Sequence, residues 1–413
     1  MTGRRRSGRR AVCALAAGLL TLQGLAGCGS PDTAERTDGD TRSVQRVLDR
    51  WSAAVRDRDE KAYLAAVDPQ AWDYRAERQR VFDRLAAVPL ASWEYRLVRT
   101  GGFAPAPGPG RRIAAEAELR YRLDGYDSAP VVVPVRLTLA GRDGRWYVAA
   151  GDSAGRQLWE QGDVTAVRGA HSLVLGVGQD RARLQALADL ADRAVPAVDT
   201  AWRGAWAGRV VIEMPASLDR MAALLGAPPA NYRGIAAVTT GEVGGTAAAP
   251  ADRIVVNPEA YGVLGEFGRR IVLTHETAHV ATRAATSPST PLWLSEGFAD
   301  WAAYRGTGRT ARQAAPELAD AVAAGKGPQQ LPGDADFGFT GEAGRLARAY
   351  EGGWLACRMI AEKWNEAKLV DVYRAFGRKR PAKEVLRKVL GVDQGEFTAR
   401  WRAYVAGQFG RTG

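Results

Sequence analysis

The order of apolar and polar residues predicts helices at the start of the chain and strands after them. From residue 43 onward apolar side chains recur at intervals of three and four, as on one buried helix face: Val44, Val47, Leu48, Trp51 and Val55. From Trp93 the apolar period becomes two. The strands "VVVPVRLTLAG" and "RWYVAAG" are joined across Asp143 and Gly144, which is a hairpin signal. Helices followed by an antiparallel meander predict an α+β domain over residues 43–155.

A second unit with its own strands and helices is predicted over residues 163–410. It opens with the strand "HSLVLGVG", continues with an amphipathic helix and returns to a strand at "RVVIEMP". The segments "GIAAVTT" and "DRIVVNP" predict a hairpin or a sheet edge, and after Pro258 nearly every segment has a helical period. The whole chain is therefore expected to be α+β, with a helix-plus-antiparallel-sheet domain first and a small sheet followed mostly by helices second.

The first 27 residues have the pattern of an export signal. Five arginines precede the apolar run "AVCALAAGLLTLQGLAG", which is shorter than the about 20 apolar residues that a membrane span requires. The run ends in Leu25, Ala26, Gly27 and Cys28, which resembles the bacterial lipobox. The resemblance implies a lipoprotein signal peptide over residues 1–27, a lipid on Cys28, and a protein anchored to the extracytoplasmic face of the cell membrane. A cleaved secretory signal and an uncleaved anchor stay open as alternatives.

Removal of this signal changes the charge and the cysteine count. The net charge of +11 falls to +6, because five of the 57 basic residues and none of the 46 acidic residues lie in the signal. Residues 28–42 are polar and are expected to form a flexible tether. With Cys28 lipidated, Cys357 is the one free thiol of the mature chain, so no internal disulfide is expected. Export also makes a nucleic-acid partner improbable, and the sequence does not indicate an oligomeric state.

Candidate chemistry begins at "HETAH", which holds two of the three histidines. A helix over residues 264–283 places His275 and His279 on one face, about 6 Å apart at Cβ, close enough to bind one metal ion. Glu276 lies about 100° around that helix, from where it can reach a metal-bound water. The third histidine, His171, begins a predicted strand and is expected to be structural or exposed.

A second motif, "PLWLSEGFADW", predicts another helix on which Glu296 and Asp300 share a face. Catalytic zinc usually has three protein ligands and an open position. His275, His279 and Glu296 are therefore the candidate ligands of one zinc ion. Asp300 is expected to support a ligand imidazole by accepting its hydrogen bond.

These two motifs together resemble the gluzincin metallopeptidases, specifically the peptidase MA-like group with its thermolysin and aminopeptidase N relatives. The resemblance implies a zincin domain that hydrolyses peptide bonds by a zinc-activated water, with Glu276 as the general base. In aminopeptidase-like relatives a later tyrosine stabilises the oxyanion, and Tyr350 in "LARAYEGGWLACRMI" resembles that position. Tyr304 is a weaker candidate for the same role.

The size and the element order of residues 43–155 resemble the cone-shaped nuclear-transport-factor-2-like domains. Such a domain binds a small molecule in its cone or only packs against a neighbour. No catalytic constellation is found in these residues, so a spacer or interaction role is expected for them.

One departure from the family concerns the substrate. Aminopeptidases of this clan hold the free amine of the substrate with a Gly-x-Met-Glu-Asn stretch before the zinc helix, and this chain has no methionine between Met221 and Met359. An endopeptidase acting on peptides or proteins is therefore favoured, with "GIAAVTT" available to pair with an extended substrate. The alternative is a non-enzymatic zinc-containing lipoprotein that acts as a binding or scaffold module at the cell surface.

Overall fold

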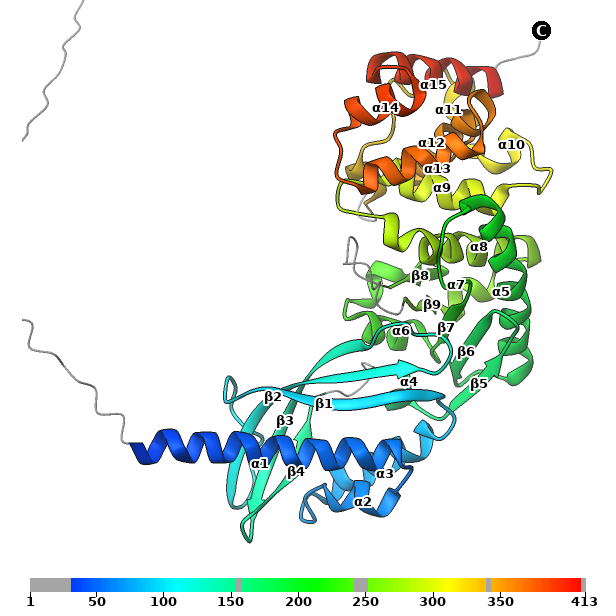
Figure 1. Ribbon diagram of the computed structural model, residues 1–413. Helices are drawn as coiled ribbons and strands as arrows, with labels where there is room; N and C mark the ends of the chain where they lie inside the picture. The colour runs from blue at the N-terminus through cyan, green and yellow to red at the C-terminus, as the bar shows by residue number, and fades with distance from the viewer. Residues whose placement is uncertain (1–30, 153–156, 241–251, 339–342, 410–413) are drawn as a thin grey trace, which may run out of the picture. The chain divides into compact units, whose positions relative to one another are not determined.

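The computed structural model describes residues 31–152, 157–240, 252–338 and 343–409 (Figure 1). The chain divides into two compact units, Met1–Arg42 and Ser43–Gly413. Helix α1 (Pro31–Arg56) begins within the stretch expected to be a flexible tether. A proline in the first turn is compatible with a helix because its missing N–H has no helical partner there, and the good helix formers Ala34, Glu35 and Arg36 come in the next turn. All elements after α1 belong to the second unit.

The first sheet is an antiparallel meander in the order β1-β2-β3-β4, as the alternating pattern predicts. Its elements and the helices before it are α2 (Glu60–Ala65), α3 (Trp72–Leu85), β1 (Leu90–Thr100), β2 (Arg111–Leu123), β3 (Val131–Arg142) and β4 (Arg145–Gly151). The hairpin at Asp143 and Gly144 is confirmed, since both residues have positive φ, 48° and 74°, and the flanking arginines pair across it. Positive φ at both positions is what a two-residue type I′ turn requires.

Aromatic side chains fill the space between this sheet and its helices. The ring centroids of Trp51 and Tyr95 lie 4.6 Å apart, and those of Trp93 and Trp159 lie 5.6 Å apart. All four residues are buried. The rings of the chain thus occupy the interior where a small molecule would otherwise bind, which favours a packing role for this part of the chain.

The second sheet has the order β5-β6-β7-β9-β8. Its strands are β5 (Val164–Arg168), β6 (Ser172–Val177), β7 (Val210–Met214), β8 (Ala237–Thr239) and β9 (Ile254–Val256). The three central strands are parallel and both edge strands are antiparallel to their neighbours. The predicted pairing of "GIAAVTT" with "DRIVVNP" is confirmed as β8–β9, whereas β5 was not expected.

The two faces of the second sheet are covered by different parts of the chain. Val174 of β6 faces a core shared with α5 (Arg181–Trp202), as its neighbours in that cluster show. Leu173, Leu175 and Val177 of the same strand belong to the core of the first sheet. Residues 43–161, called the N-terminal module below, therefore share a core with the second sheet. Burial of each such side chain contributes about 1.5–3 kcal/mol, so the module cannot be removed without exposing them.

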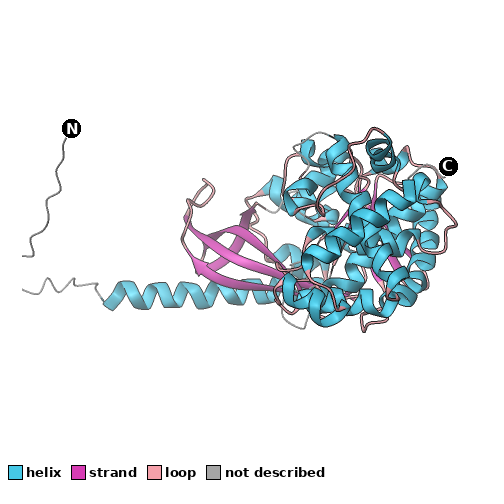
Figure 2. Cartoon of the chain, turned by 90° about the horizontal axis from the view of Figure 1, so that it is seen from above, coloured by secondary structure: helices cyan, strands magenta, loops and turns pink. Residues whose placement is uncertain are grey.

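Helices dominate the rest of the chain, as expected after Pro258. Figure 1 shows the second sheet between the first sheet and these helices, and Figure 2 shows the first sheet at one side of the helical part. The remaining elements are α4 (Leu158–Gln161), α6 (Leu218–Leu225), η1 (Pro229–Tyr232), α7 (Pro258–Gly262), α8 (Glu266–Thr282), η2 (Arg283–Ala285), α9 (Leu292–Tyr304), α10 (Ala311–Ala314), α11 (Pro316–Ala323), η3 (Asp334–Phe337), α12 (Ala343–Lys363), α13 (Glu366–Gly377), α14 (Ala382–Leu390) and α15 (Gln394–Phe409). Among the described residues no helix combines the length and the apolar character that crossing a membrane requires.

Candidate metal centre

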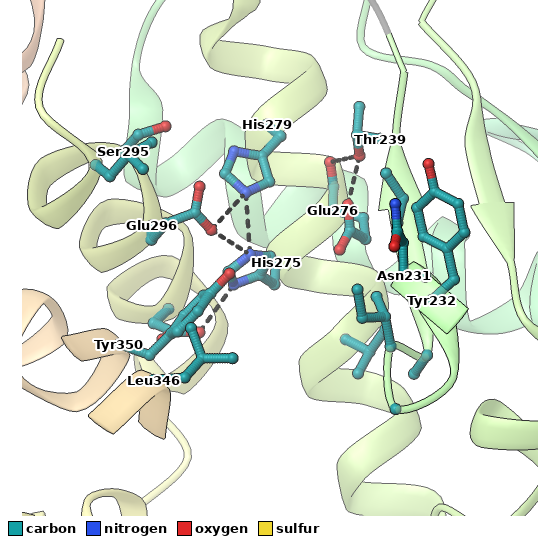
Figure 3. Close-up of a pocket in the computed structure, with 18 of the residues that line it drawn as sticks. Asn231, Tyr232, Thr239, His275, Glu276, His279, Ser295, Glu296, Leu346 and Tyr350 are labelled. Carbon is teal, nitrogen blue, oxygen red and sulfur yellow. Dashed lines mark hydrogen bonds and ion pairs between the residues drawn. The ribbon is translucent and has the colours of Figure 1, made fainter. Parts of the chain in front are cut away.

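Two helices bring the three expected metal ligands to one point. His275 and His279 lie one turn apart on α8, and Glu296 lies on α9 (Figure 3). The two Nε2 atoms are 3.0 Å apart, and each lies 3.3 Å from Oε2 of Glu296. In the described part of the chain, these residues form the one group of histidine, cysteine and acidic side chains that is arranged to hold a metal ion.

The spacing of these three atoms fits zinc. Bonds of about 2.0–2.2 Å in a tetrahedral arrangement place neighbouring ligand atoms about 3.3–3.6 Å apart. The three separations in this site agree with that edge length to within a few tenths of an ångström. Two imidazole nitrogens and one carboxylate oxygen are also the donor set that suits zinc at a catalytic site.

Asp300 sets the orientation and the tautomer of the first histidine. Its Oδ1 lies 2.8 Å from Nδ1 of His275. Because a carboxylate can only accept, Nδ1 carries a proton, and Nε2 is the nitrogen left to bind a cation, which displaces any proton on it. Burial disfavours charge on this ring, but the carboxylates of Asp300 and Glu296 outweigh burial and hold the pKa of His275 well above its usual value. The pocket thus stabilises positive charge at the point where a cation would sit.

The carboxylate of Glu296 is held in its charged form. Burial raises its pKa, but the neighbouring imidazoles of His279 and His275 outweigh burial and leave the pKa well below its usual value. A charged carboxylate with its oxygen aimed at both Nε2 atoms is in the state that a metal ligand needs.

Glu276 lies beside the ligand set and outside it. Its Oε2 accepts a hydrogen bond of 2.6 Å from the hydroxyl of Thr239, on the edge strand β8. Figure 3 shows the Glu276 carboxylate on the Thr239 side of the cleft, with Glu296 and Tyr350 on the other side. The side chain is buried and lines the cleft. It is therefore placed to exchange a proton with a group bound in the cleft and does not share the metal position.

Tyr350 faces the same cleft from α12. Its ring centroid lies 6.3 Å from that of His275 and 5.3 Å from that of Phe337. Burial, and then the nearby charge of Glu296, raise the pKa of the hydroxyl, so Tyr350 stays protonated and can donate. Tyr304 is not among the cleft residues, because its ring packs against Phe267 and Trp354.

A close approach of two helices brings Tyr350 to the site. A Cβ on Gly297 of α9 would lie 2.3 Å from the carbonyl oxygen of Gly353 on α12. Only glycine permits two helix backbones to touch in this way. Gly297 follows the ligand Glu296, and Gly353 lies one turn after Tyr350, so the contact joins the ligand helix to the tyrosine helix at the site.

A buried tyrosine of α13 links the two helices, α8 and α9, that carry the three candidate ligands. The hydroxyl of Tyr373 lies 3.2 Å from Oγ1 of Thr282, 2.8 Å from Oγ1 of Thr286 and 3.4 Å from Oγ of Ser295. Thr282 ends α8, and Ser295 precedes Glu296 on α9. Because Thr282 donates to the carbonyl of Ala278, it accepts from Tyr373. This network fixes α8 against α9.

The site opens into a cleft of about 1010 Å³. Six residues labelled in Figure 3 mark its two walls: Asn231, Tyr232 and Thr239 on one side, and Ser295, Leu346 and Tyr350 on the other. All three residues of β8 line the cleft, and in the sheet order this strand lies at the edge. An extended chain can pair with such an edge.

The other sequence candidates lie elsewhere. Nδ1 of His171 is 3.3 Å from the carbonyl oxygen of Gly208, and His171 does not line the cleft. Cys357 is buried with a free thiol. Cys28 lies outside the described residues. Sequence reasoning missed Thr239 and Tyr373, since neither belongs to a motif; the one available signal was the expected pairing of "GIAAVTT" with an extended substrate, which brings this segment to the cleft.

Two solved structures show a distant likeness to the chain. No family model and no curated protein matches the chain. Among solved structures it is similar to a mutant of a two-domain M1 zinc metallopeptidase bound to L-arginine, at 14% identity and a TM-score of 0.31, over 65% of this chain and 58% of that one. It is also similar to a SEC-C motif containing protein from Rhodopseudomonas palustris, at 18% identity and a TM-score of 0.18, over 30% of this chain and 94% of that one. Likeness at this level carries no functional inference.

Proposed function

We propose that the protein is a zinc-dependent metallopeptidase that hydrolyses internal peptide bonds. The observation that carries the proposal is the convergence of three metal-ligand atoms, 3.0–3.3 Å apart, beside a carboxylate that is not one of them. A site that only holds a metal for stability has no use for such a carboxylate in an open cleft, whereas hydrolysis requires a base there.

His275, His279 and Glu296 would hold the zinc ion. A zinc ion bound by these residues supplies a Lewis acid that polarises a carbonyl and lowers the pKa of bound water to about 7. Asp300 keeps the His275 ring in the orientation and tautomer that this binding needs.

Glu276 is the proton-transfer group of the proposal. Its carboxylate accepts the proton of the attacking water and returns it to the amine that leaves. The hydrogen bond from Thr239 holds one carboxylate oxygen and leaves the other to face the cleft. Proton transfer by a side chain placed in this way contributes about 10²–10⁴-fold to a rate.

Tyr350 is the proposed donor to the oxyanion. As the carbonyl becomes tetrahedral, its oxygen gains charge, and a fixed hydroxyl stabilises that charge without reorganisation. Tyr350 stays protonated and lies on the wall opposite Glu276 (Figure 3). The base and the hydrogen-bond donor would therefore contact the bound carbonyl group from different sides.

The cleft suits an extended peptide. The edge strand β8 lines it, and backbone pairing with this strand would hold a substrate across the metal position. The Gly-x-Met-Glu-Asn stretch with which aminopeptidases of this clan hold a free amine is missing, since the chain has no methionine between Met221 and Met359. This supports cleavage within a chain rather than at its amino end.

The cellular setting belongs to the proposal on sequence grounds. A signal peptide over residues 1–27 and a lipid on Cys28 would anchor the protein at the extracytoplasmic face of the membrane. The N-terminal part over residues 43–155 is proposed as a nuclear-transport-factor-2-like domain, and residues 163–410 as a gluzincin domain.

Metal content and peptide hydrolysis test the proposal together. The full-length protein should bind one zinc ion and cut a mixed library of peptides whose amino termini are acetylated. His275→Ala should lose both properties, while the matched control His171→Ala keeps them, because His171 lies outside the cleft. Zinc bound without any cleavage would instead favour the non-enzymatic lipoprotein. Cleavage of peptides with free amino termini alone would make the protein an aminopeptidase.

A further inference from the structure

We propose that Asp127 of the N-terminal module is a positioning residue for the base Glu276, acting through Arg253 and the edge strand β8. The catalytic part of this inference rests on the proposed function. Its structural part does not, because it concerns the contacts that hold β8 in place.

Asp127 binds Arg253 with both carboxylate oxygens. The guanidinium Nη1 and Nη2 of Arg253 lie 2.8 and 2.7 Å from Oδ1 and Oδ2 of Asp127. The two side chains are 1% and 6% exposed, so water screens this pair little. Asp127 is itself fixed in the β2–β3 turn, where its Oδ2 accepts from the backbone of Leu123 at 2.7 Å. Arg253 is therefore held from the side of the N-terminal module.

The backbone of Arg253 closes the end of the β8–β9 hairpin. Its N–H donates to Oγ1 of Thr240 at 3.0 Å, and its carbonyl accepts from the N–H of Thr240 at 2.8 Å. The hairpin itself pairs only three residues of each strand. A strand this short, at a sheet edge, has few contacts of its own. The position of β8 therefore depends strongly on the closure at Thr240 and Arg253.

Thr239, which precedes this closure, is the residue that holds the base. Its hydroxyl lies 2.6 Å from Oε2 of Glu276 and 3.2 Å from the carbonyl oxygen of Glu276. A shift of the strand end therefore moves the one hydrogen-bond donor that the described structure gives to this carboxylate.

The same end of the hairpin also binds the residue that follows α8. Arg283, directly after α8, donates from Nε to both oxygens of Asp252, at 3.1 and 3.2 Å, and from Nη2 to the carbonyl of Thr240 at 3.2 Å. Of the two adjacent residues, Asp252 binds Arg283 at the end of α8, and Arg253 binds Asp127 of the N-terminal module. The end of the hairpin is therefore held from one side by the end of α8 and from the other by the N-terminal module.

Loss of the Asp127 charge would weaken the contact between Arg253 and the N-terminal module. Arg253 would stay buried, and the carboxylate of Glu213, whose Oε1 lies 3.7 Å from Nε of Arg253, would become its nearest charged partner. We expect Arg253 to turn toward Glu213 and the closure with Thr240 to loosen.

The test compares Asp127→Asn with the matched control Asp68→Asn in the full-length protein. Asp68 also binds an arginine with both oxygens, at 2.6 and 2.8 Å from Arg142, and its side chain is 0% exposed, but this pair lies within the N-terminal module. Both variants should lose similar thermal stability. Only Asp127→Asn should speed hydrogen exchange at the amides of Thr240 and Arg253, by about tenfold or more.

Activity and zinc binding give the second readout. In Asp127→Asn, kcat should fall about tenfold while the zinc Kd stays within twofold of wild type, since the ligand atoms are not on β8. Asp127→Glu, which keeps the charge, should recover most of the lost kcat and of the lost exchange protection. If the asparagine variant does not fold, Arg253→Lys, which cannot bind both carboxylate oxygens of Asp127, takes its place with the same expected outcomes.

Two results would overturn the inference. One is equal amide exchange at Thr240 and Arg253 in the two asparagine variants. The other is a zinc Kd that rises as much as kcat falls, which would place the effect on the ligands. If the wild-type protein cuts no peptide, the proposed function fails, and the exchange comparison still decides whether Asp127 holds the strand.

Discussion

Replacing Gly297 by alanine tests how closely α9 and α12 must approach for the site to form. The new Cβ would lie 2.3 Å from the carbonyl oxygen of Gly353 and 2.4 Å from its carbonyl carbon, whereas ordinary contact begins at 3.4 Å. Both atoms belong to the backbone of α12, so no side-chain rotation relieves the overlap. The two helices would have to move apart by about 1 Å, because a packed interior has no free space to absorb the methyl group.

Both stability and activity should fall in this variant. Overpacking costs typically about 1–3 kcal/mol, and the better helix propensity of alanine offsets about 0.5–1 kcal/mol, so the middle of the two ranges gives a net loss of about 1 kcal/mol. Tyr350 lies one turn before Gly353, so it would move away from the ligands with α12. A misplacement of about 1 Å at a reacting group can cost about 10²-fold in rate.

Thermal melting and peptide hydrolysis measure the two effects. The matched control is Gly268→Ala on α8, where the nearest atom to a new Cβ is Cβ of Leu264 at an ordinary 3.5 Å. This control should melt at or slightly above the wild-type temperature, while Gly297→Ala melts a few degrees lower and loses most of its activity. If Gly297→Ala melts like the control and hydrolyses peptides at the wild-type rate, the close helix contact does not position Tyr350.

Three further predictions concern the surroundings of the site. Asp300→Ala should weaken zinc binding about 10–100-fold, because His275 loses the partner that orients it; a chelator competition that shows less than a twofold change would contradict this. Tyr373→Phe should cost about 1–3 kcal/mol of unfolding free energy, measured by denaturant titration, since it leaves buried hydroxyls without their shared partner; an unchanged midpoint would contradict it. Glu351, on α12, accepts from the backbone at the start of α11, and burial together with its hydrogen bond to Glu317 raises its pKa to about 9. The folded state therefore binds this proton more tightly than the unfolded state, so its stabilising contribution is full below about pH 4.5 and is lost as the pH rises through about 9. Glu351→Gln should flatten the alkaline loss in melting curves recorded from pH 5 to 9, and an identical profile would refute the assignment.

Local patterns in the sequence were enough to predict several elements. Asp143 and Gly144 specify their hairpin by themselves, because two successive residues must adopt positive φ and few residue pairs do so. The spacing of His275 and His279 on a helix needs only the helical repeat. In both cases the relevant contacts lie within a few residues of each other, where the backbone period decides the geometry.

The contacts between distant segments could not be read in this way. Thr239 reaches Glu276 only because an edge strand passes over α8, and Tyr373 reaches Thr282 from α13, far along the chain. The sharing of one core by the two sheets was also missed, since the alternation of β6 shows that both faces are apolar but not what covers each. Strand β5 is short and has few strongly apolar residues, so its period gave no signal.

The most direct test of the central claim is hydrolysis by the zinc-loaded protein compared with its Glu276→Gln variant. Glutamine has the shape of glutamate and can still contact Thr239, but it cannot accept a proton, so metal binding should persist while catalysis stops. We predict one zinc ion per chain in both proteins, cleavage of the acetylated peptide library by the wild type, and a rate at least about 10²-fold lower in the variant. Equal cleavage by the two zinc-loaded proteins would contradict the assignment of Glu276 as the base and with it the proposed mechanism.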